Sequence, residues 1–195
     1  MEILFSDKDI AVCIKPQGLD SEKDVPNTLS EILGGDFYTV HRLDKNVGGV
    51  MVYARNSKAA AKLSLAIQNG EMIKEYVAMV HGTPPESGVM EDFLFKDSSK
   101  NKVFVVKRER KGVKKAKLEY DIIKAGETSL IHIRLHTGRS HQIRVQFASR
   151  GFPLLGDRKY GGKDEHASPM LFSSKITFPH HGKILTFEAS PEWAN

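Results

Sequence analysis

The chain has 195 residues, of which 40% are apolar, and a formal net charge of +5. This length and apolar content can bury one hydrophobic core, so we expect residues 1–195 to form a single domain. The acidic N-terminal segment has no apolar run long enough for a signal peptide or a membrane span, which predicts a cytoplasmic protein without a membrane partner. The single cysteine, Cys13, cannot form an internal disulfide and is expected in the core.

The first third of the chain predicts strands and helices in alternation. The apolar run at 10–15 predicts a strand. Asn27 or Thr28 is expected to cap a short helix that ends at Gly34. A second apolar run, 50–53, predicts a buried strand. A helix is expected next. Asn56-Ser57 is its N-cap signal, Gly70 is its stop, and the apolar residues between them, Ala60, Leu63 and Ile67, recur at helical spacing.

The rest of the chain is richer in strands. Short turns join most of them, which predicts mainly antiparallel pairing and an α+β fold. The basic stretch is expected to form a hairpin that turns around Gly112. In chain order, the sequence predicts strands at 74–80, two within 103–124, one at 130–136, a helix at 140–150, and a final pair of strands at 171–178 and 184–188.

The positive charge is concentrated in one part of the sequence. Residues 100–119 contain nine Lys or Arg and two acids, a net charge of +7, whereas the remainder has 20 basic and 22 acidic residues. A solvated hairpin is the ordinary explanation of such a run, but a positive arm on a nearly neutral body also attracts a phosphate backbone. We therefore expect a nucleic acid to contact this basic limb, residues 107–117, through Lys107, Arg108, Arg110 and Lys111.

The sequence predicts neither a metal ion nor a nucleotide cofactor. The nearest histidine pairs are His132 with His136 and His180 with His181, and no cysteine cluster or HExxH pattern accompanies them. We expect solvated or structural histidines. A Walker loop and a GxGxxG turn are both absent, which argues against binding of ATP or NAD.

Two polar segments are the candidates for chemistry. In the first, His41-Arg42-Leu43-Asp44, Asp44 lies on a loop that enters the strand at 50–53, a common place for a functional side chain. An aspartate that caps a turn and pairs with Arg42 is the structural alternative.

The second segment, 137–144, reads Thr-Gly-Arg-Ser-His-Gln-Ile-Arg. Thr137 or Ser140 is expected to cap the helix that follows, and free N–H groups of its first turn could meet an anion. Arg144 lies off the apolar stripe of this helix and could point at a carboxylate. An exposed helix arginine is the structural alternative.

These motifs, taken together, resemble the A-type ribosomal-large-subunit pseudouridine synthases. The resemblance covers nearly the whole chain. The matching segments occur in the family's order: the strand and Lys-Pro-x-Gly motif at 10–18, His-Arg-Leu-Asp at 41–44, Lys-Glu-Tyr-Val-Ala at 74–78, the segment at 137–144, and the signature at 151–161 with Gly156-Asp157 and Tyr160. The resemblance implies a mixed, mainly antiparallel sheet with flanking helices and a central catalytic cleft.

The resemblance also implies site roles. Asp44 acts on the sugar as a nucleophile or as a base, Arg144 pairs with it and keeps it ionised, and Tyr76 stacks near the uracil. Arg42 fills the space that the extruded uridine leaves in the RNA. The substrate is ribosomal RNA, transfer RNA or both, and no cofactor is required. Further substrate contacts are expected from the motif neighbours Leu43, Arg139, His141 and Gln142.

Two departures from the family pattern bear on these expectations. The family usually has Thr-Ser-Gly where this chain has Val47-Gly48-Gly49. A catalytically inactive RNA-binding protein or assembly factor on the same fold is therefore the alternative function. Met1 lies almost directly before the catalytic motifs, so we expect no N-terminal RNA-binding module, and we expect a monomer.

Overall fold

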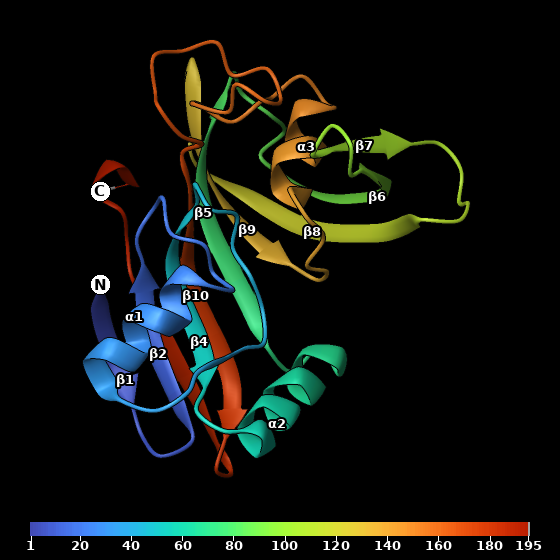
Figure 1. Cartoon of the computed structure of the whole chain (residues 1–195). Coiled ribbons are helices and arrows are strands. Elements are labelled where there is room, and N and C mark those ends of the chain that lie inside the picture. Colours follow the sequence, from blue (N-terminus) through green and yellow to red (C-terminus); the bar gives the residue numbers. More distant parts are fainter. Residues whose placement is uncertain (195) are drawn as a thin grey trace. The chain divides into compact units, whose positions relative to one another are not determined.

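The computed structural model describes residues 1–194, which form two compact units (Figure 1). Unit 1 contains Met1–Lys74 and the C-terminal segment from Phe172, and unit 2 is Glu75–Leu171. The expected α+β class is confirmed, because strands that pair mainly in antiparallel fashion accompany three helices. Within residues 1–194, no helix has the length and apolar character needed to cross a membrane.

The strands of unit 1 form a mixed sheet with β4 near its centre. In order across the sheet lie β1 (Glu2–Ser6), β2 (Ile10–Lys15), β4 (Gly48–Ala54) and β10 (Leu171–His180). The pairs β1/β2 and β2/β4 are antiparallel, whereas β4 and β10 are parallel. Two more strands pair at the side, β3 (Tyr38–Thr39) with β4 and β11 (Lys183–Glu188) with β10. The strands expected at 10–15, 50–53, 171–178 and 184–188 are thereby confirmed.

Unit 1 has its core around β4, all seven residues of which are buried. Strands buried on both faces read as continuous apolar runs, which is why 50–53 could be assigned from sequence. Helix α2 (Ser57–Gln68) covers one face through Leu63, which packs with Val52 and Phe178.

The helix boundaries of unit 1 confirm one expectation and correct another. Asn56 is the N-cap of α2 and accepts a hydrogen bond from the Ala59 N–H, and Gly70 follows the helix with a φ of 73°. Helix α1 runs over Asp24–Leu33, so its expected start at Asn27 or Thr28 was wrong. The first turn is instead organised by Asp20 and Asp24: the Asp24 carboxylate accepts the Asp20 N–H, and the Asp20 carboxylate accepts the N–H groups of the next turn.

Unit 2 is a sheet of five strands with one helix. Its strand order is β5, β9, β8, β6, β7, and the bounds are β5 (Ile73–His81), β6 (Ser87–Asp97), β7 (Lys102–Val106), β8 (Val113–Lys124) and β9 (Thr128–Leu135). Alternate residues of β5 are buried, as its sequence predicts, and they include Tyr76. Helix α3 (Gln142–Ala148) packs its Val145 against Leu94 and Val103. A short 3-10 turn, η1 (Glu192–Ala194), ends the described chain.

The expected basic hairpin was wrong. The strands on either side of the basic turn, β7 and β8, do not pair with each other, because β6 lies between them and pairs with both. No strand was expected at Ser87–Asp97. With β6 missing from the prediction, β7 and β8 were expected to pair with each other. The basic turn, residues 107–112, is therefore a connection that crosses β6, from Val106 beside Phe93 to Val113 beside Phe95.

Helix α3 is shorter than the predicted 140–150, and neither expected residue caps it. His141 stands at the N-cap position in the left-handed conformation, with a φ of 51°, and makes no side-chain cap bond. The Thr137 hydroxyl instead donates to Gln142 Oε1 and accepts the Lys117 N–H. At the other end, Phe147 packs edge-on against Tyr120, with 5.2 Å between ring centroids.

Candidate active site

The loop that carries Asp44 is fixed by hydrogen bonds to its backbone from within unit 1. Asp44 lies between β3 and β4, and its carbonyl accepts the Val47 N–H at 2.9 Å. One residue before it, the Leu43 N–H and carbonyl both bond to the Ser21 hydroxyl, at 3.1 and 2.6 Å. The Tyr53 hydroxyl in turn donates to the Ser21 carbonyl. The aspartate is thus presented on a backbone with little freedom.

The loop is also held from the side of β2 by a buried lysine. Lys15 is fully buried, and its ammonium group donates to the carbonyls of Pro16, Leu19 and Lys45 at 2.8 to 3.1 Å. Burial lowers the pKa of Lys15 to about 8, against the opposing effect of the Asp20 and Asp44 carboxylates. The sequence analysis quoted the Lys-Pro-x-Gly motif but gave this lysine no role. Its role in the structure is to join the residue after Asp44 to the end of β2.

His41 is anchored on the strand that the loop enters. Its Nε2 accepts the Val52 N–H at 3.2 Å, so the ring proton lies on Nδ1, which has no hydrogen-bond partner within residues 1–194. Burial, with a smaller contribution from the charge of Lys74, lowers the pKa of His41 to about 3. A neutral imidazole therefore forms part of the loop's framework.

The Val47-Gly48-Gly49 segment fits this loop without the two hydroxyls of the family pattern. Val47 is buried, with 2% of its surface exposed. Gly49 has a φ of 128°, and a Cβ at this position would come within 2.4 Å of the Ser173 backbone. The glycine permits the close parallel pairing of β4 with β10. The loop therefore has its backbone hydrogen bonds without hydroxyl groups at positions 47 and 48.

The other two residues of the first motif lie in contrasting surroundings. Leu43 is buried, with 6% of its surface exposed, so it contributes to the core beneath the loop. The Arg42 side chain is 54% exposed and forms a surface ion pair with Glu22 at 3.0 Å. The structural alternative was that Asp44 caps a turn and pairs with Arg42. In the structure, the acid that pairs with Arg42 is Glu22.

In unit 2, Arg144 points at a carboxylate that the sequence analysis did not assign to it. Arg144 lies on α3 with 8% of its surface exposed. Its Nε donates to Asp157 Oδ2 at 2.7 Å and its Nη2 donates to Asp157 Oδ1 at 2.8 Å. The alternative of an exposed helix arginine is therefore wrong. Asp44 belongs to the other unit, and its pairing with Arg144 stays a prediction.

Tyr160 completes the surroundings of Arg144. The guanidinium carbon lies 5.3 Å from the centroid of the Tyr160 ring. The Tyr160 hydroxyl accepts the Val103 N–H and forms a second hydrogen bond, of 2.8 Å, with His141 Nδ1. Arg144 is held at one edge by Asp157 and over one face by Tyr160. Such a fixed guanidinium is suited to holding an anion in one orientation.

The remaining residues of the second motif organise the turn before α3. Gln142 is buried; its Oε1 accepts from Thr137 and from the Arg139 N–H, and its Nε2 donates to Lys117. The Arg139 side chain is exposed and donates from Nε to the Lys115 carbonyl. Together with Lys96 and Lys114, Arg139 lines a pocket of about 180 Å³ in unit 2.

The basic limb lies next to aromatic side chains of the unit 2 sheet. Its four expected RNA contacts, Lys107, Arg108, Arg110 and Lys111, are all exposed and precede β8. Three cations lie over aromatic rings with 5.1 to 5.9 Å to the centroid, namely Arg110 over Phe95, Lys115 over Phe93 and Lys102 over Phe104. Cations among flat apolar rings are typical of surfaces that bind single-stranded nucleic acid. The sequence analysis identified the charges but not the rings, because β6 was missed.

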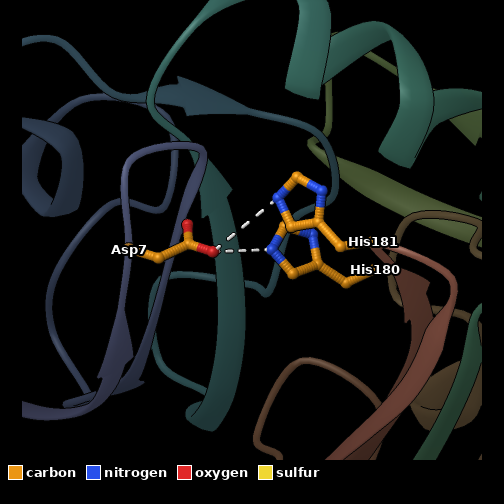
Figure 2. Close-up of side chains that lie close together, drawn as sticks. All are labelled: Asp7, His180 and His181. Carbon is orange, nitrogen blue, oxygen red and sulfur yellow. Dashed lines mark hydrogen bonds and ion pairs between the residues drawn. The ribbon is translucent and has the colours of Figure 1, made fainter.

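Histidine and acidic side chains gather elsewhere in unit 1. Within residues 1–194, one group could hold a metal ion: Asp7, His180 and His181, whose ligand atoms lie within 4.8 Å of one another (Figure 2). Asp44 is not part of it.

The fold and these motifs together define an RNA-modifying class of protein, and comparison with known proteins agrees. A profile described as RNA pseudouridylate synthase matches residues 9–149. The chain belongs to this family. The dual-specificity RNA pseudouridine synthase RluA of Escherichia coli (strain K12) is 34% identical over 212 residues, which cover 98% of this chain and 93% of that protein.

Other relatives are longer than this chain. The ribosomal large subunit pseudouridine synthase D of Borreliella burgdorferi is 32% identical over 89% of this chain and 60% of its own length. An RNA pseudouridine synthase of Aquifex aeolicus is 34% identical with the same two coverages. Among solved structures, human RNA pseudouridylate synthase domain containing 1 superposes with a TM-score of 0.84 at 20% identity, over 97% of this chain and 83% of that one. This last likeness concerns the fold.

Proposed function

We propose that this chain converts specific uridines in RNA to pseudouridine, with Asp44 as the essential carboxylate. One observation carries the proposal: in a member of this family, hydrogen bonds hold the backbone of the Asp44 loop at three consecutive residues. The Ser21 hydroxyl bonds to Leu43, the Val47 N–H to the Asp44 carbonyl, and the Lys15 ammonium group to the Lys45 carbonyl. Preorganisation of this kind is what a residue needs in order to act on a sugar in a defined orientation.

The proposed reaction is an isomerisation. The C1′–N1 glycosidic bond of the uridine breaks, the uracil turns, and C1′ bonds to C5. The proton on C5 is lost and N1 gains one, so that substrate and product have the same atoms. Nothing is oxidised and no phosphate is transferred, and the proposed reaction needs no cofactor. Asp44 attacks the sugar as a nucleophile or removes a proton from it as a base.

Arg144 and Tyr76 are the proposed partners of Asp44. The Arg144 guanidinium would keep the carboxylate ionised, since a nearby positive charge favours the charged form of an acid. Its Asp157 and Tyr160 contacts would fix its orientation, which makes these two residues positioning residues. Tyr76, with 5% of its surface exposed, would stack near the uracil and assist proton transfer at C5.

The proposed substrate is ribosomal RNA, transfer RNA or both. The names of two relatives support this choice, since one is a dual-specificity RNA pseudouridine synthase and another a ribosomal large subunit pseudouridine synthase. The target uridine must leave its helix or loop to reach the Asp44 carboxylate, and Arg42 would fill the space left behind. The exposure of Arg42 and its surface partner Glu22 are compatible with such a rearrangement.

The proposed RNA contacts extend over unit 2. The basic limb would contact phosphates through Lys107, Arg108, Arg110 and Lys111. Lys96 and Lys114, which line the pocket beside Arg139, would add positive charge to the same unit. His141 and Gln142 would act through the turn that they shape, and Leu43 through the core beneath the Asp44 loop. We further infer that the two units work as one catalytic domain, with the catalytic cleft that the resemblance implies, in a monomeric and cytoplasmic protein.

An inactive RNA-binding protein is the second candidate, and only Val47-Gly48 favours it. The buried Val47 and the tightly packed Gly49 weaken that argument, because the loop is held by backbone bonds and by Lys15 instead. The test is to map pseudouridines in ribosomal and transfer RNA from cells with and without the gene for this chain. The proposal expects at least one position to lose its pseudouridine and to regain it on complementation. Identical maps would favour the inactive protein.

A further inference from the structure

Two turns meet at one end of the unit 1 sheet. The turn between β1 and β2 carries Asp7, and the hairpin of β10 and β11 carries His180 at the end of β10 and His181 in its turn (Figure 1). The three side chains point toward one another (Figure 2). Asp7 Oδ2 lies 2.7 Å from His180 Nε2 and 4.0 Å from His181 Nε2. Two imidazole nitrogens and one carboxylate oxygen therefore converge on a single point.

The Asp7 carboxylate is oriented by the backbone of its own turn. Its Oδ1 accepts the N–H groups of Asp9 and Ile10, both at 2.8 Å, which leaves Oδ2 to the histidines. Burial raises the pKa of Asp7, but the hydrogen bonds from His180 and from these N–H groups outweigh it and hold the pKa below 3.8. An ionised carboxylate with one oxygen bound to the backbone and the other facing two imidazoles is arranged as a single-oxygen metal ligand.

The histidine pair depends on an unusual residue in a tight turn. His180 pairs with Lys183, so that His181 and Gly182 form a two-residue hairpin loop, and their φ values of 48° and 74° fit a type I′ turn. Asparagine followed by glycine is the usual choice for these positions, and histidine is among the few other residues that are enriched in the left-handed conformation. The left-handed residue brings the second imidazole alongside the first, with ring centroids 4.1 Å apart.

A second carboxylate, that of Asp9, contacts His181. Asp9 Oδ2 lies 2.8 Å from His181 Nε2, and Asp9 Oδ1 accepts from the Asn56 side chain, the N-cap of α2. His181 Nε2 is the nitrogen that would bind the metal ion, so Asp9 must release it on metal binding, and its carboxylate is then close enough to serve as a further ligand. The histidine side chains differ in exposure, 12% for His180 and 47% for His181, so the site opens to solvent on one side.

We propose that Asp7, His180 and His181 bind a divalent first-row transition metal ion, with Zn²⁺ as the best fit to a two-imidazole, one-carboxylate set. Zinc takes such ligands at about 2.0–2.1 Å in tetrahedral geometry, which separates ligand atoms by roughly 3.3 Å. His180 and Asp7 would move apart and His181 would move closer, each by less than an ångström. Two nitrogen donors disfavour Mg²⁺ and Ca²⁺, which prefer oxygen.

This site is separate from the proposed catalytic carboxylate. Gly48, which follows the Asp44 loop, pairs with Phe172 at the start of β10, whereas His180 is the last residue of that strand. At about 3.3 Å per residue, the two ends of β10 lie roughly 26 Å apart. The ion would join the first hairpin of unit 1 to the last and stabilise the fold, whatever the outcome for the catalytic proposal. From the sequence, His180 and His181 were expected to be solvated or structural histidines, since no cysteine cluster or HExxH pattern accompanies them. Asp7, the third member of this cluster, lies 173 residues away from His180 along the chain.

The test is a calorimetric titration of the metal-free full-length protein with Zn²⁺, repeated on two variants. His181→Asn removes a ligand but places a favoured residue in the type I′ turn, so it should fold at least as well as the wild type. His166→Asn is the control, since His166 is an exposed histidine of unit 2. We expect one equivalent of Zn²⁺ to bind the wild type and the control equally, and His181→Asn to bind at least about tenfold more weakly.

Thermal unfolding gives a second measurement. Zn²⁺ should raise the Tm of the wild type and of His166→Asn, because a ligand that binds only the folded state stabilises it, and it should leave His181→Asn almost unchanged. The proposal is overturned if the wild type binds no Zn²⁺, or if wild type and His181→Asn show the same affinity and the same shift in Tm. The cluster would then be a pair of histidine–carboxylate contacts that hold the two turns together.

Discussion

Arg144 and Asp157 form a two-point ion pair inside unit 2. Two parallel N–H to oxygen bonds of 2.7 and 2.8 Å join them, and the exposed fractions of the two side chains are 9% and 1%. Taking two charges out of water is costly, and only good geometry on both sides repays that cost. We infer that this ion pair fixes the direction of the Arg144 guanidinium.

We expect Arg144→Met to destabilise the protein by about 3–5 kcal/mol, because it leaves the Asp157 carboxylate buried without a partner. The double variant Arg144→Met with Asp157→Leu should regain most of this free energy of unfolding, since no buried charge remains alone. Neither variant should form pseudouridine. Urea denaturation measures the stabilities. Equal stability of Arg144→Met and the wild type would show that the pair is not energetically coupled.

Tyr76→Phe separates two proposed roles of the buried tyrosine. The phenylalanine ring keeps the stacking surface, and the variant loses only the hydroxyl. If this hydroxyl assists proton transfer at C5, turnover should fall by about 10²- to 10⁴-fold while RNA affinity stays unchanged. Single-turnover kinetics at saturating enzyme measures the chemical step without the binding step. An undiminished rate in Tyr76→Phe would assign the residue to stacking alone.

The basic limb should supply phosphate contacts. Replacing Lys107, Arg108, Arg110 and Lys111 together by Ser should weaken RNA binding, and each lost contact should lower the slope of log affinity against log salt by roughly 0.7 to 0.9. The matched control removes the same charge from exposed lysines of unit 1, namely Lys8, Lys58, Lys62 and Lys183. Filter binding over a range of salt concentrations measures both variants. Equal slopes for the two variants would make the basic limb an ordinary solvated turn.

His41 should make the stability of the protein depend on pH. Its pKa is about 3 in the folded chain and 6.5 without burial, so between these values the unfolded chain binds a proton that the folded chain does not. The free energy of unfolding contributed by His41 is therefore complete above pH 6.5 and is lost as the pH falls, by up to about 1.4 kcal/mol per unit.

The variant His41→Gln isolates this effect. Glutamine retains an acceptor for the Val52 N–H but cannot take up a proton, so its stability should fall less between pH 7 and pH 5 than that of the wild type. Histidines with acidic partners, such as His136 beside Glu119, are the same in both proteins and cancel in the difference. The same pH dependence in both proteins would mean that His41 is solvated.

The sequence predicted those elements whose signals are local. The buried β4 reads as an unbroken apolar run, Asn56 caps α2 through a bond only three residues away, and Gly70 ends the helix. The start of α1 was misplaced because Asn27 and Thr28 are good caps in general, whereas Asp20 and Asp24 organise this turn together. Local rules rank the candidate caps but do not choose between them.

The errors and omissions at the site have a common cause, which is separation along the chain. Asp157 lies thirteen residues beyond Arg144, and no periodicity links an arginine on a helix to a carboxylate in a later turn. Lys15 holds the Asp44 loop through a carbonyl thirty residues away. The motifs identified which segments matter. They could not show which buried partner fixes each side chain, because that depends on how distant segments pack.

The central claim is that Asp44 performs the chemistry, and Asp44→Asn tests it most directly, since it removes the charge with almost no change in shape. The wild type, Asp44→Asn and the control Asp36→Asn, an exposed aspartate of unit 1, are incubated with total RNA from cells that lack this protein. Pseudouridine formed is then measured, and RNA affinity is measured in parallel. We predict product from the wild type and the control, none from Asp44→Asn, and similar RNA binding by all three. No product from the wild type, or full activity of Asp44→Asn, would contradict the account.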